Sequence, residues 1–251
     1  MEYSLKKSLG QHFLKDENIC KRIVDTLQQH SFLQLLEVGP GGGALTKYLV
    51  KIPAINFKAV ELDQEKVVYL EKAFPKMSGK IIHENFLDID PPFEESFIVI
   101  GNFPYNISTQ ILFKMLEWKE QVPVMIGMFQ KEVAERAASK EGSKVYGVLS
   151  VLVQAFYDVE YLFDVDPSCF NPPPQVMSGV IRLTKRKEVL NMKSERAFFN
   201  VVKTAFNQRR KTMRNAVKGL FSADVLQEEL FSKRAEVLSV EQFAALTFRM
   251  N

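Results

Sequence analysis

The sequence predicts an α/β protein with a doubly wound, mostly parallel sheet, an antiparallel edge strand and a small all-α C-terminal domain. In the first half of the chain, short apolar runs alternate with segments of helical periodicity, which is typical of open parallel sheets. A glycine cluster at 39–43 separates the first such run from the segment of helical periodicity that follows it. From Ser194 onward, apolar residues recur only at helical spacing.

The elements of the first part can be assigned in order. Asp16 is placed to cap a helix over 16–29, because its carboxylate can accept hydrogen bonds from the first free N–H groups. The continuous apolar run 33–38 is typical of a buried parallel strand. The other predicted strands are 55–61, 80–83, 97–101 and 122–129, and the predicted helices are 44–50, 64–73 and 109–117.

The pattern changes after Val145. The apolar runs 147–163 and 175–183 are predicted as strands with no helix between them, which indicates an antiparallel pair at one edge of the sheet. Helical segments follow at 197–206, 209–221, 223–231 and 239–248. With the boundary in 185–193, we expect two domains, 1–185 and 186–251.

Composition and charge exclude some classes of protein. With 46% hydrophobic residues the chain is too apolar for disorder, and Cys20 and Cys169 form neither a disulfide framework nor a metal-ligand spacing with the histidines. We therefore expect reduced thiols and no metal. Because no apolar run is long enough for a signal peptide or a membrane span, we expect a cytoplasmic protein.

The formal net charge of +3 hides an asymmetry. Residues 184–251 carry 14 basic and 7 acidic side chains, net +7, whereas the rest of the chain has net −4. A basic tail on a mildly acidic body favours a polyanionic partner. On charge alone, a solvated Lys- and Arg-rich helical face remains an equal alternative.

The glycine cluster and an acidic residue indicate a nucleoside-containing cofactor. Gly39 to Gly43 lies between a strand and a helix, where glycines let the backbone turn sharply and approach a ligand. Glu61 ends the next strand, where a carboxylate can accept hydrogen bonds from both ribose hydroxyls. Both features fit a nicotinamide dinucleotide as well as S-adenosylmethionine (SAM), so they do not choose between them.

The sequence Asn102-Phe-Pro-Tyr105 separates these two cofactors. It follows the strand at 97–101, at the sheet edge where open α/β folds bind ligands. An exocyclic purine amine is a poor nucleophile because its lone pair is delocalised. If the Asn102 oxygen and a nearby carbonyl accept its two N–H bonds, the nitrogen can be aimed at a methyl donor without a strong base. Tyr105 offers a ring on which an extruded base can stack.

Five ordered segments strongly resemble one family. LGQHFL (9–14), EVGPGGGALT (37–46), GNFPYNIST (101–109), FNPPPQVMSGVIRL (170–183) and FNQRRKTMRN (206–215) resemble the rRNA adenine N6-dimethyltransferases, and among them the bacterial small-subunit enzymes linked to kasugamycin sensitivity. The resemblance implies a Rossmann-like SAM methyltransferase domain followed by an RNA-binding domain. It also implies S-adenosyl-L-methionine as cofactor and 16S rRNA in the immature small subunit as partner.

The resemblance assigns roles residue by residue. It implies a catalytic set of Asn102, Pro104, Tyr105 and Phe170, in which Phe170 stacks on the flipped adenine. The implied cofactor-binding set is Gln11, His12, Leu14, Gly39, Gly41, Glu61, Leu62, Asn85, Phe86 and Asn102, with the segment around Phe13 closing over the cofactor.

One position departs from the family pattern. Where the family usually has an Asp that accepts a hydrogen bond from the cofactor adenine, this chain has Asn85. An amide oxygen can still accept that bond, but it should bind more weakly because it carries no charge. We assign the role to Asn85, with Asp88 as the alternative.

The resemblance also explains the basic tail. Arg209, Arg210, Lys211, Arg214 and Lys218 fall on one predicted helix, and three of them recur at i, i+4 and i+8. Such a face can follow a phosphate backbone and give salt-dependent RNA affinity.

The expected function is dimethylation of N6 on two adjacent adenosines in the 3′-terminal hairpin of 16S rRNA, by an enzyme expected to be a monomer. The nearest alternative is the erythromycin-resistance type, which methylates one adenosine of 23S rRNA. A non-catalytic nucleic-acid-binding relative is a second alternative, which the intact Asn102 to Tyr105 motif disfavours. A nicotinamide dehydrogenase would explain the glycine turn and Glu61 but neither that motif nor the basic segment.

Overall fold

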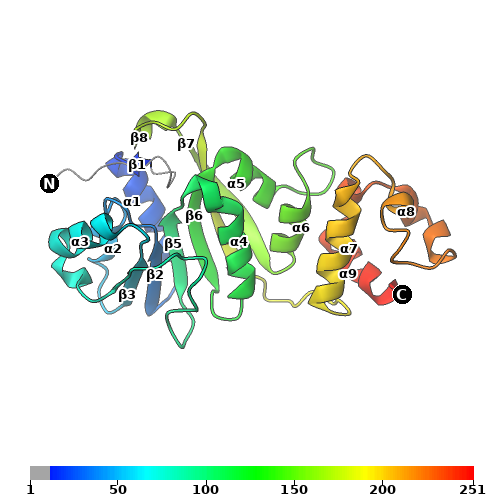
Figure 1. Cartoon of the computed structure of the whole chain (residues 1–251), viewed down its shortest axis with the longest axis horizontal. Helices are drawn as coiled ribbons and strands as arrows, with labels where there is room; N and C mark the ends of the chain where they lie inside the picture. Colours follow the sequence, from blue (N-terminus) through cyan, green and yellow to red (C-terminus); the bar gives the residue numbers. More distant parts are fainter. Residues whose placement is uncertain (1–11) are drawn as a thin grey trace. The chain divides into compact units, whose positions relative to one another are not determined.

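The computed structural model describes residues 12–251, in which most strands join one mixed sheet (Figure 1). Within these residues, seven strands form one sheet in the order β4-β3-β2-β5-β6-β9-β7. A separate antiparallel pair joins β1 (Phe13–Leu14) to β8 (Phe170–Asn171). The strands of the large sheet are β2 (Gln34–Val38), β3 (Asn56–Val60), β4 (Ile81–Ile82), β5 (Ile98–Asn102), β6 (Val124–Gln130), β7 (Tyr157–Val165) and β9 (Ser178–Lys185).

The strand pairing confirms the predicted α/β class. β2 runs parallel to both β3 and β5, and β5 runs parallel to β6, whereas β9 is antiparallel to β6. From β2 the chain builds outward through β3 to β4 and then returns to the other side of β2 with β5. The strand order therefore reverses between β2 and β5. In open α/β sheets, the carboxyl ends of the strands beside such a reversal form a binding crevice.

Helices connect the successive parallel strands except β4 and β5, which are joined by a loop. The first begins where predicted, because the Asp16 carboxylate accepts hydrogen bonds from the backbone N–H groups of Asn18 (2.9 Å) and Ile19 (3.1 Å). The helical elements of this part are α1 (Glu17–Asp25), η2 (Thr26–Gln29), α2 (Thr46–Leu49), α3 (Gln64–Ala73), η3 (Pro75–Met77), η4 (Tyr105–Ile107), α4 (Ser108–Glu117), α5 (Lys131–Ala138) and η5 (Pro167–Cys169), where η denotes a 3₁₀ helix.

The sheet is covered on both faces. On one face, buried residues of α1 such as Ile23 pack with Leu49 of α2 against Leu35 and Ile98 of the sheet. Because successive strand residues point to opposite faces, Leu36 and Val99 point away from that cluster, and α4 packs against β6. No helix within residues 12–251 is long and apolar enough to cross a membrane.

The predicted strand over 147–163 is wrong in its first half. Residues Val148–Gln154 form helix α6, and only Tyr157–Val165 form a strand, β7. The α6 residues from Leu149 to Val153 are all buried, so the helix has no polar face to reveal its period. Periodicity cannot distinguish a fully buried helix from a buried strand.

The chain divides into two compact units, and the division differs from the predicted one in one segment. Residues 160–185 belong with the N-terminal part up to Ala134, whereas Glu135–Val159 join Arg186–Asn251 in the second unit. The second unit therefore includes α6 in addition to the predicted C-terminal helices. Its other helical elements are α7 (Glu195–Asn207), α8 (Met213–Ala216), η6 (Val225–Gln227), η7 (Glu229–Ser232), η8 (Ala235–Val237), α9 (Val240–Leu246) and η9 (Thr247–Arg249).

The predicted helix over 209–221 is wrong. Helix α7 ends at Asn207, and α8 spans only Met213–Ala216. Between them Thr212 is extended and forms an antiparallel bridge with Arg234, and the Met213 N–H donates to the Lys233 carbonyl (2.8 Å). This pairing with a distant segment interrupts the helix, so the basic residues of the segment do not share one helical face.

The five basic residues differ in their surroundings. The Arg209 guanidinium donates to the carbonyls of Lys144 and Tyr146 and forms an ion pair with Glu236. Arg214 donates through Nε to the Leu226 carbonyl (2.8 Å). The remaining three are exposed, namely Arg210, Lys211 and Lys218. Arg209 and Arg214 thus connect segments of the second unit.

Replacing Arg209 with Ala should destabilise the second unit by about 1 kcal/mol, mainly through the lost hydrogen bonds to carbonyl groups. The ion pair with Glu236 adds little because the Arg209 side chain is 45% exposed. Urea unfolding measures the change, and Arg210→Ala is the matched control with no expected effect. Equal stability of the two variants would contradict this role for Arg209.

Candidate active site

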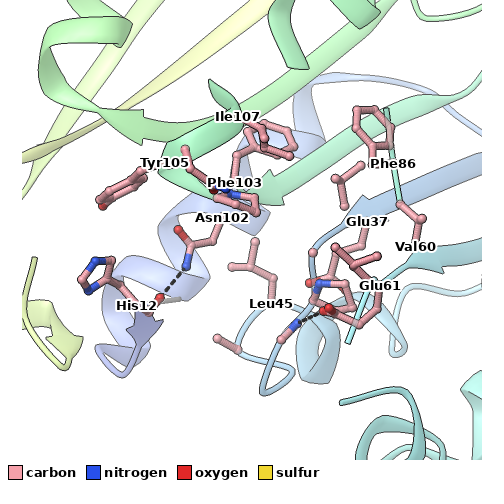
Figure 2. A pocket seen from close by; sticks show the side chains of 18 of the residues that line it. His12, Glu37, Leu45, Val60, Glu61, Phe86, Asn102, Phe103, Tyr105 and Ile107 are labelled. Atoms are coloured by element: carbon pink, nitrogen blue, oxygen red, sulfur yellow. Dashed lines mark hydrogen bonds between the residues drawn. The ribbon is translucent and has the colours of Figure 1, made fainter. Parts of the chain in front are cut away.

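A cavity of about 230 Å³ lies at the carboxyl ends of β2, β3 and β5 (Figure 2). The segment beginning at His12, the glycine turn and the loop after β4 also line it. The predicted residues that line this cavity are His12, Leu14, Gly39, Gly41, Glu61, Leu62, Asn85, Phe86, Asn102, Pro104 and Tyr105. Gln11 lies outside the described residues.

The glycine turn needs its glycines. Gly39, Gly41 and Gly43 have φ angles of +66°, +55° and +80°, a region that other residues rarely adopt. A Cβ atom on Gly41 would lie 3.2 Å from the Phe13 ring, and one on Gly43 would lie 2.4 Å from the Phe74 ring. The turn therefore combines left-handed backbone with close approach of two aromatic side chains.

Glu61 connects the end of β3 to the glycine turn. Its carboxylate accepts hydrogen bonds from the N–H groups of Gly41 (3.0 Å) and Asp63 (2.9 Å), and the residue is 7% exposed. Burial raises the pKa of this carboxyl above its ordinary value. An ionised carboxylate has about four acceptor positions, so these two bonds leave capacity for hydroxyl donors in the cavity.

Glu37 is a second acidic residue of the cavity, and sequence reasoning missed it. It lies in β2, it is buried, and it accepts a hydrogen bond from the Thr46 hydroxyl (2.6 Å). Burial raises the pKa of Glu37 to about 8. The available signal was an acidic residue inside the apolar run 33–38, directly before the glycine turn.

Asn102 ends β5 and is held in one orientation. Its Nδ2 donates to the His12 carbonyl (3.2 Å), which assigns the amide nitrogen to that side. Figure 2 shows the amide oxygen turned toward Tyr105. The side chain therefore offers an acceptor oxygen, and one of its two N–H donors is already used.

Phe103 anchors the turn that follows Asn102. It is buried and packs on Phe129 with ring centroids 4.9 Å apart. A Cβ atom on Gly101 or on Gly127 would lie 2.8 or 2.1 Å from the Phe103 ring. Two glycines on adjacent strands thus make room for the ring, and sequence reasoning found no role for Gly127.

Tyr105 lies beside His12. The two ring centroids are 5.5 Å apart and the ring planes are inclined by 30°. The Tyr105 hydroxyl is hydrogen-bonded to the Ser178 hydroxyl at the start of β9. Burial raises the pKa of the phenol, so this side chain is neutral at physiological pH.

The loop after β4 favours Asn85 over Asp88 for a cofactor contact. Asn85 lines the cavity, and Asp88 does not. The Asn85 oxygen accepts from the Leu87 N–H (3.2 Å) while its nitrogen donates to Asp88 (2.7 Å). Asp88 therefore orients the Asn85 amide, whose oxygen retains one acceptor position.

Phe170 does not line the cavity. It is 1% exposed, it belongs to the hydrophobic core, and its strand β8 pairs with Leu14 of β1. Stacking of Phe170 on a base therefore remains a prediction, and in this structure the residue stabilises the segment that carries His12.

Among the described residues, no group of three or more His, Cys, Asp or Glu side chains is arranged to hold a metal ion.

Comparison with known proteins decides the family. A model of the family described as ribosomal RNA adenine dimethylase matches residues 2–249. The chain belongs to the ribosomal RNA adenine dimethylase family. A relative from Flavobacterium johnsoniae named ribosomal RNA small subunit methyltransferase A is 54% identical, over 96% of this chain and 94% of the relative. A relative of the same name from Cytophaga hutchinsonii is 52% identical, over 96% and 95% of the two chains.

Solved structures share the fold of this family member. A dimethyladenosine transferase from Plasmodium falciparum has a TM-score of 0.81 at 24% identity, covering 92% of this chain and 94% of that one. A 23S rRNA methyltransferase, ErmE, has a TM-score of 0.76 at 23% identity, covering 95% and 99%. At this level of identity the two structures support the α/β fold and do not distinguish between substrates.

Replacing Glu37 with Gln should remove a pH dependence of stability. Glu37 has a native pKa of about 8 against an ordinary value of 4.5. Between these pH values the native state retains a proton that the unfolded state releases, so stability falls by up to about 1.4 kcal/mol per pH unit as the pH rises. The amide of the Glu37→Gln variant cannot ionise, and its oxygen can still accept the Thr46 hydrogen bond.

Urea unfolding of both proteins from pH 5 to pH 8 measures this difference. We expect the variant to gain stability relative to the native protein as the pH rises, with the largest gain near pH 8. A constant difference across that range would show that the Glu37 pKa is not raised.

Proposed function

We propose that this chain is a SAM-dependent enzyme that adds two methyl groups to N6 of each of two adjacent adenosines in the 3′-terminal hairpin of 16S rRNA. The Asn102 side chain carries the chemical part of the proposal, because its oxygen is an oriented acceptor at the cavity. The choice of the small subunit is supported by the names of relatives more than 50% identical over nearly the whole chain.

The cavity residues fit S-adenosylmethionine. Glu61 has free acceptor capacity for the ribose hydroxyls, and the left-handed glycine turn lets the backbone approach the ligand. Leu62 and Phe86 offer apolar surface for the adenine ring, and Asn85 can accept from its amine. When bound, the cofactor supplies the methyl group.

Asn102 acts on the target amine by positioning it. Its oxygen and a backbone carbonyl of the turn accept the two N–H bonds of the adenine N6 atom. These hydrogen bonds hold the nitrogen toward tetrahedral geometry and direct its lone pair at the methyl group. No strong general base is required because the proton leaves after the new N–C bond forms, when the nitrogen is cationic and acidic.

Tyr105 supplies the surface on which the flipped adenine stacks. Its ring lies at the cavity beside His12, so it is available to a base that enters from the RNA side. Pro104 keeps the turn between Asn102 and Tyr105 short, because its ring restricts the backbone. Phe170 can join this stack only if it leaves the core.

Three exposed cations of the second unit, Arg210, Lys211 and Lys218, are proposed to bind the phosphate backbone of the RNA. Sequence specificity then comes from unpaired bases and RNA shape.

We propose the immature small subunit as substrate, a monomeric enzyme and a cytoplasmic location. The small-subunit names of relatives more than 50% identical to this chain favour this substrate over the large-subunit alternative.

Asn102→Ala should reduce methyl transfer to immature small subunits by about two to three orders of magnitude, the range seen when one oriented transition-state hydrogen bond is removed. SAM affinity should change little. Radiolabelled methyl incorporation and calorimetric SAM binding measure the two effects. The control is Asn56→Ala, at the amino end of β3 and away from the cavity. An Asn102→Ala enzyme with full activity would refute the positioning role.

Replacing Arg210, Lys211 and Lys218 together with Ala should weaken RNA binding and reduce its salt dependence. Each lost phosphate contact lowers the slope of log K against log salt concentration by roughly 0.7 to 0.9, so we expect a reduction of about 2 to 3. Filter binding at several salt concentrations measures the slope. A control with the same charge change replaces Lys51, Lys72 and Lys76, which are exposed in the first unit. Equal slopes for the two variants would contradict this assignment.

A further inference from the structure

We propose that Ser178 is a positioning residue that fixes the ring of Tyr105 for the incoming adenine, an inference that rests on the function proposed above. Ser178 belongs to the segment 170–183, in which the sequence assigned a role only to Phe170. Its hydroxyl is hydrogen-bonded to the hydroxyl of Tyr105. It lies outside the set of residues that line the cavity, so its effect on the reaction passes through Tyr105.

The sheet determines the position of the Ser178 hydroxyl. Ser178 is fully buried at the start of β9, in antiparallel register with Gln130 at the end of β6. The Lys131 N–H donates to the Met177 carbonyl (2.9 Å) and extends this pairing by one residue. The Ser178 side chain therefore projects from a backbone that is hydrogen-bonded on both sides of it.

Tyr105 needs such an anchor because its backbone alone does not determine where its ring lies. The Ser108 hydroxyl donates to the Tyr105 carbonyl (3.1 Å) and holds the peptide, but two side-chain bonds still rotate. The phenol oxygen is the side-chain atom farthest from the backbone and lies on the axis of the Cβ–Cγ bond. A fixed partner there therefore restricts rotation about the Cα–Cβ bond and holds the ring in place. The His12 ring lies against the Tyr105 ring and limits its rotation from a second side. The ring nitrogen Nδ1 of His12 is itself hydrogen-bonded to the Pro172 carbonyl (3.0 Å).

This arrangement predicts which step depends on Ser178. Tyr105 and Glu61 lie at opposite ends of the cavity (Figure 2), so a change at the Tyr105 hydroxyl leaves the cofactor-binding end intact. A stacked base follows the position of the ring on which it stacks, and its N6 atom must meet the Asn102 oxygen. A mobile ring therefore lowers the fraction of bound adenines that are in reactive geometry.

The test is a double-mutant cycle on the full-length enzyme with Ser178→Ala, Tyr105→Phe and the two combined. We measure single-turnover methyl transfer to undermethylated small subunits, SAM affinity and the thermal unfolding temperature. Each single variant should lose about tenfold in rate, in line with one buried neutral hydrogen bond. The double variant should lose no more than either single variant, because both remove the same bond. SAM affinity should stay within about twofold of the native value.

Ser150→Ala is the matched control, because Ser150 is also a fully buried serine whose hydroxyl is hydrogen-bonded, in the second unit. It should leave the rate per folded molecule unchanged. Losses of about a hundredfold in the double variant, or a Ser178→Ala enzyme with the native rate, would overturn the proposal. If Ser178→Ala does not fold, an unchanged rate in Tyr105→Phe overturns it equally. An inactive native enzyme would instead refute the proposed function.

Discussion

The parallel pairing of β2 with β5 is the constraint on which the site depends. Leu35, Leu36 and Glu37 of β2 lie in register with Ile98, Val99 and Ile100 of β5. Continued to the strand ends, this register places Gly39 level with Asn102. The approach is close, because a Cβ atom on Gly39 would lie 3.6 Å from the Pro104 side chain. Backbone hydrogen bonds therefore bring together the glycine turn, which we propose to approach the cofactor, and the Asn102 side chain, which we propose to orient the target amine.

Contacts made by residues inside and outside the recognised motifs complete this arrangement. Gly127 of β6 makes room for Phe103, and the hydrogen bond from Asn102 to the His12 carbonyl joins the N-terminal segment to the end of β5. That segment is held from its other side, since β1 pairs with β8 and the Lys15 N–H donates to the Cys169 carbonyl (2.8 Å). We therefore expect a change in any of these contacts to move the Asn102 oxygen relative to the cavity.

The sequence was informative where a local cause determines the structure. Asp16 capped its helix, the glycine turn followed its strand, and the predicted parallel strands formed with small shifts in their ends. It failed where distant contacts decide. Helix α6 is buried on all sides, so its sequence pattern predicted a strand. The pairing of Thr212 with Arg234 interrupts the segment 209–221, for which periodicity predicted one continuous helix. In the site, Glu37 and Ser178 were missed because their partners, Thr46 and Tyr105, are set by tertiary structure.

We propose that two adenosines of the small-subunit rRNA are methylated at this cavity. The most direct measurement is SAM-dependent methyl incorporation into undermethylated small and large subunits separately, followed by mapping of the modified bases. We expect four methyl groups per small subunit, as two adjacent N6-dimethyladenosines in the 3′-terminal hairpin, and none on the large subunit. Methylation of a single adenosine on the large subunit, or RNA binding without methyl transfer, would contradict it.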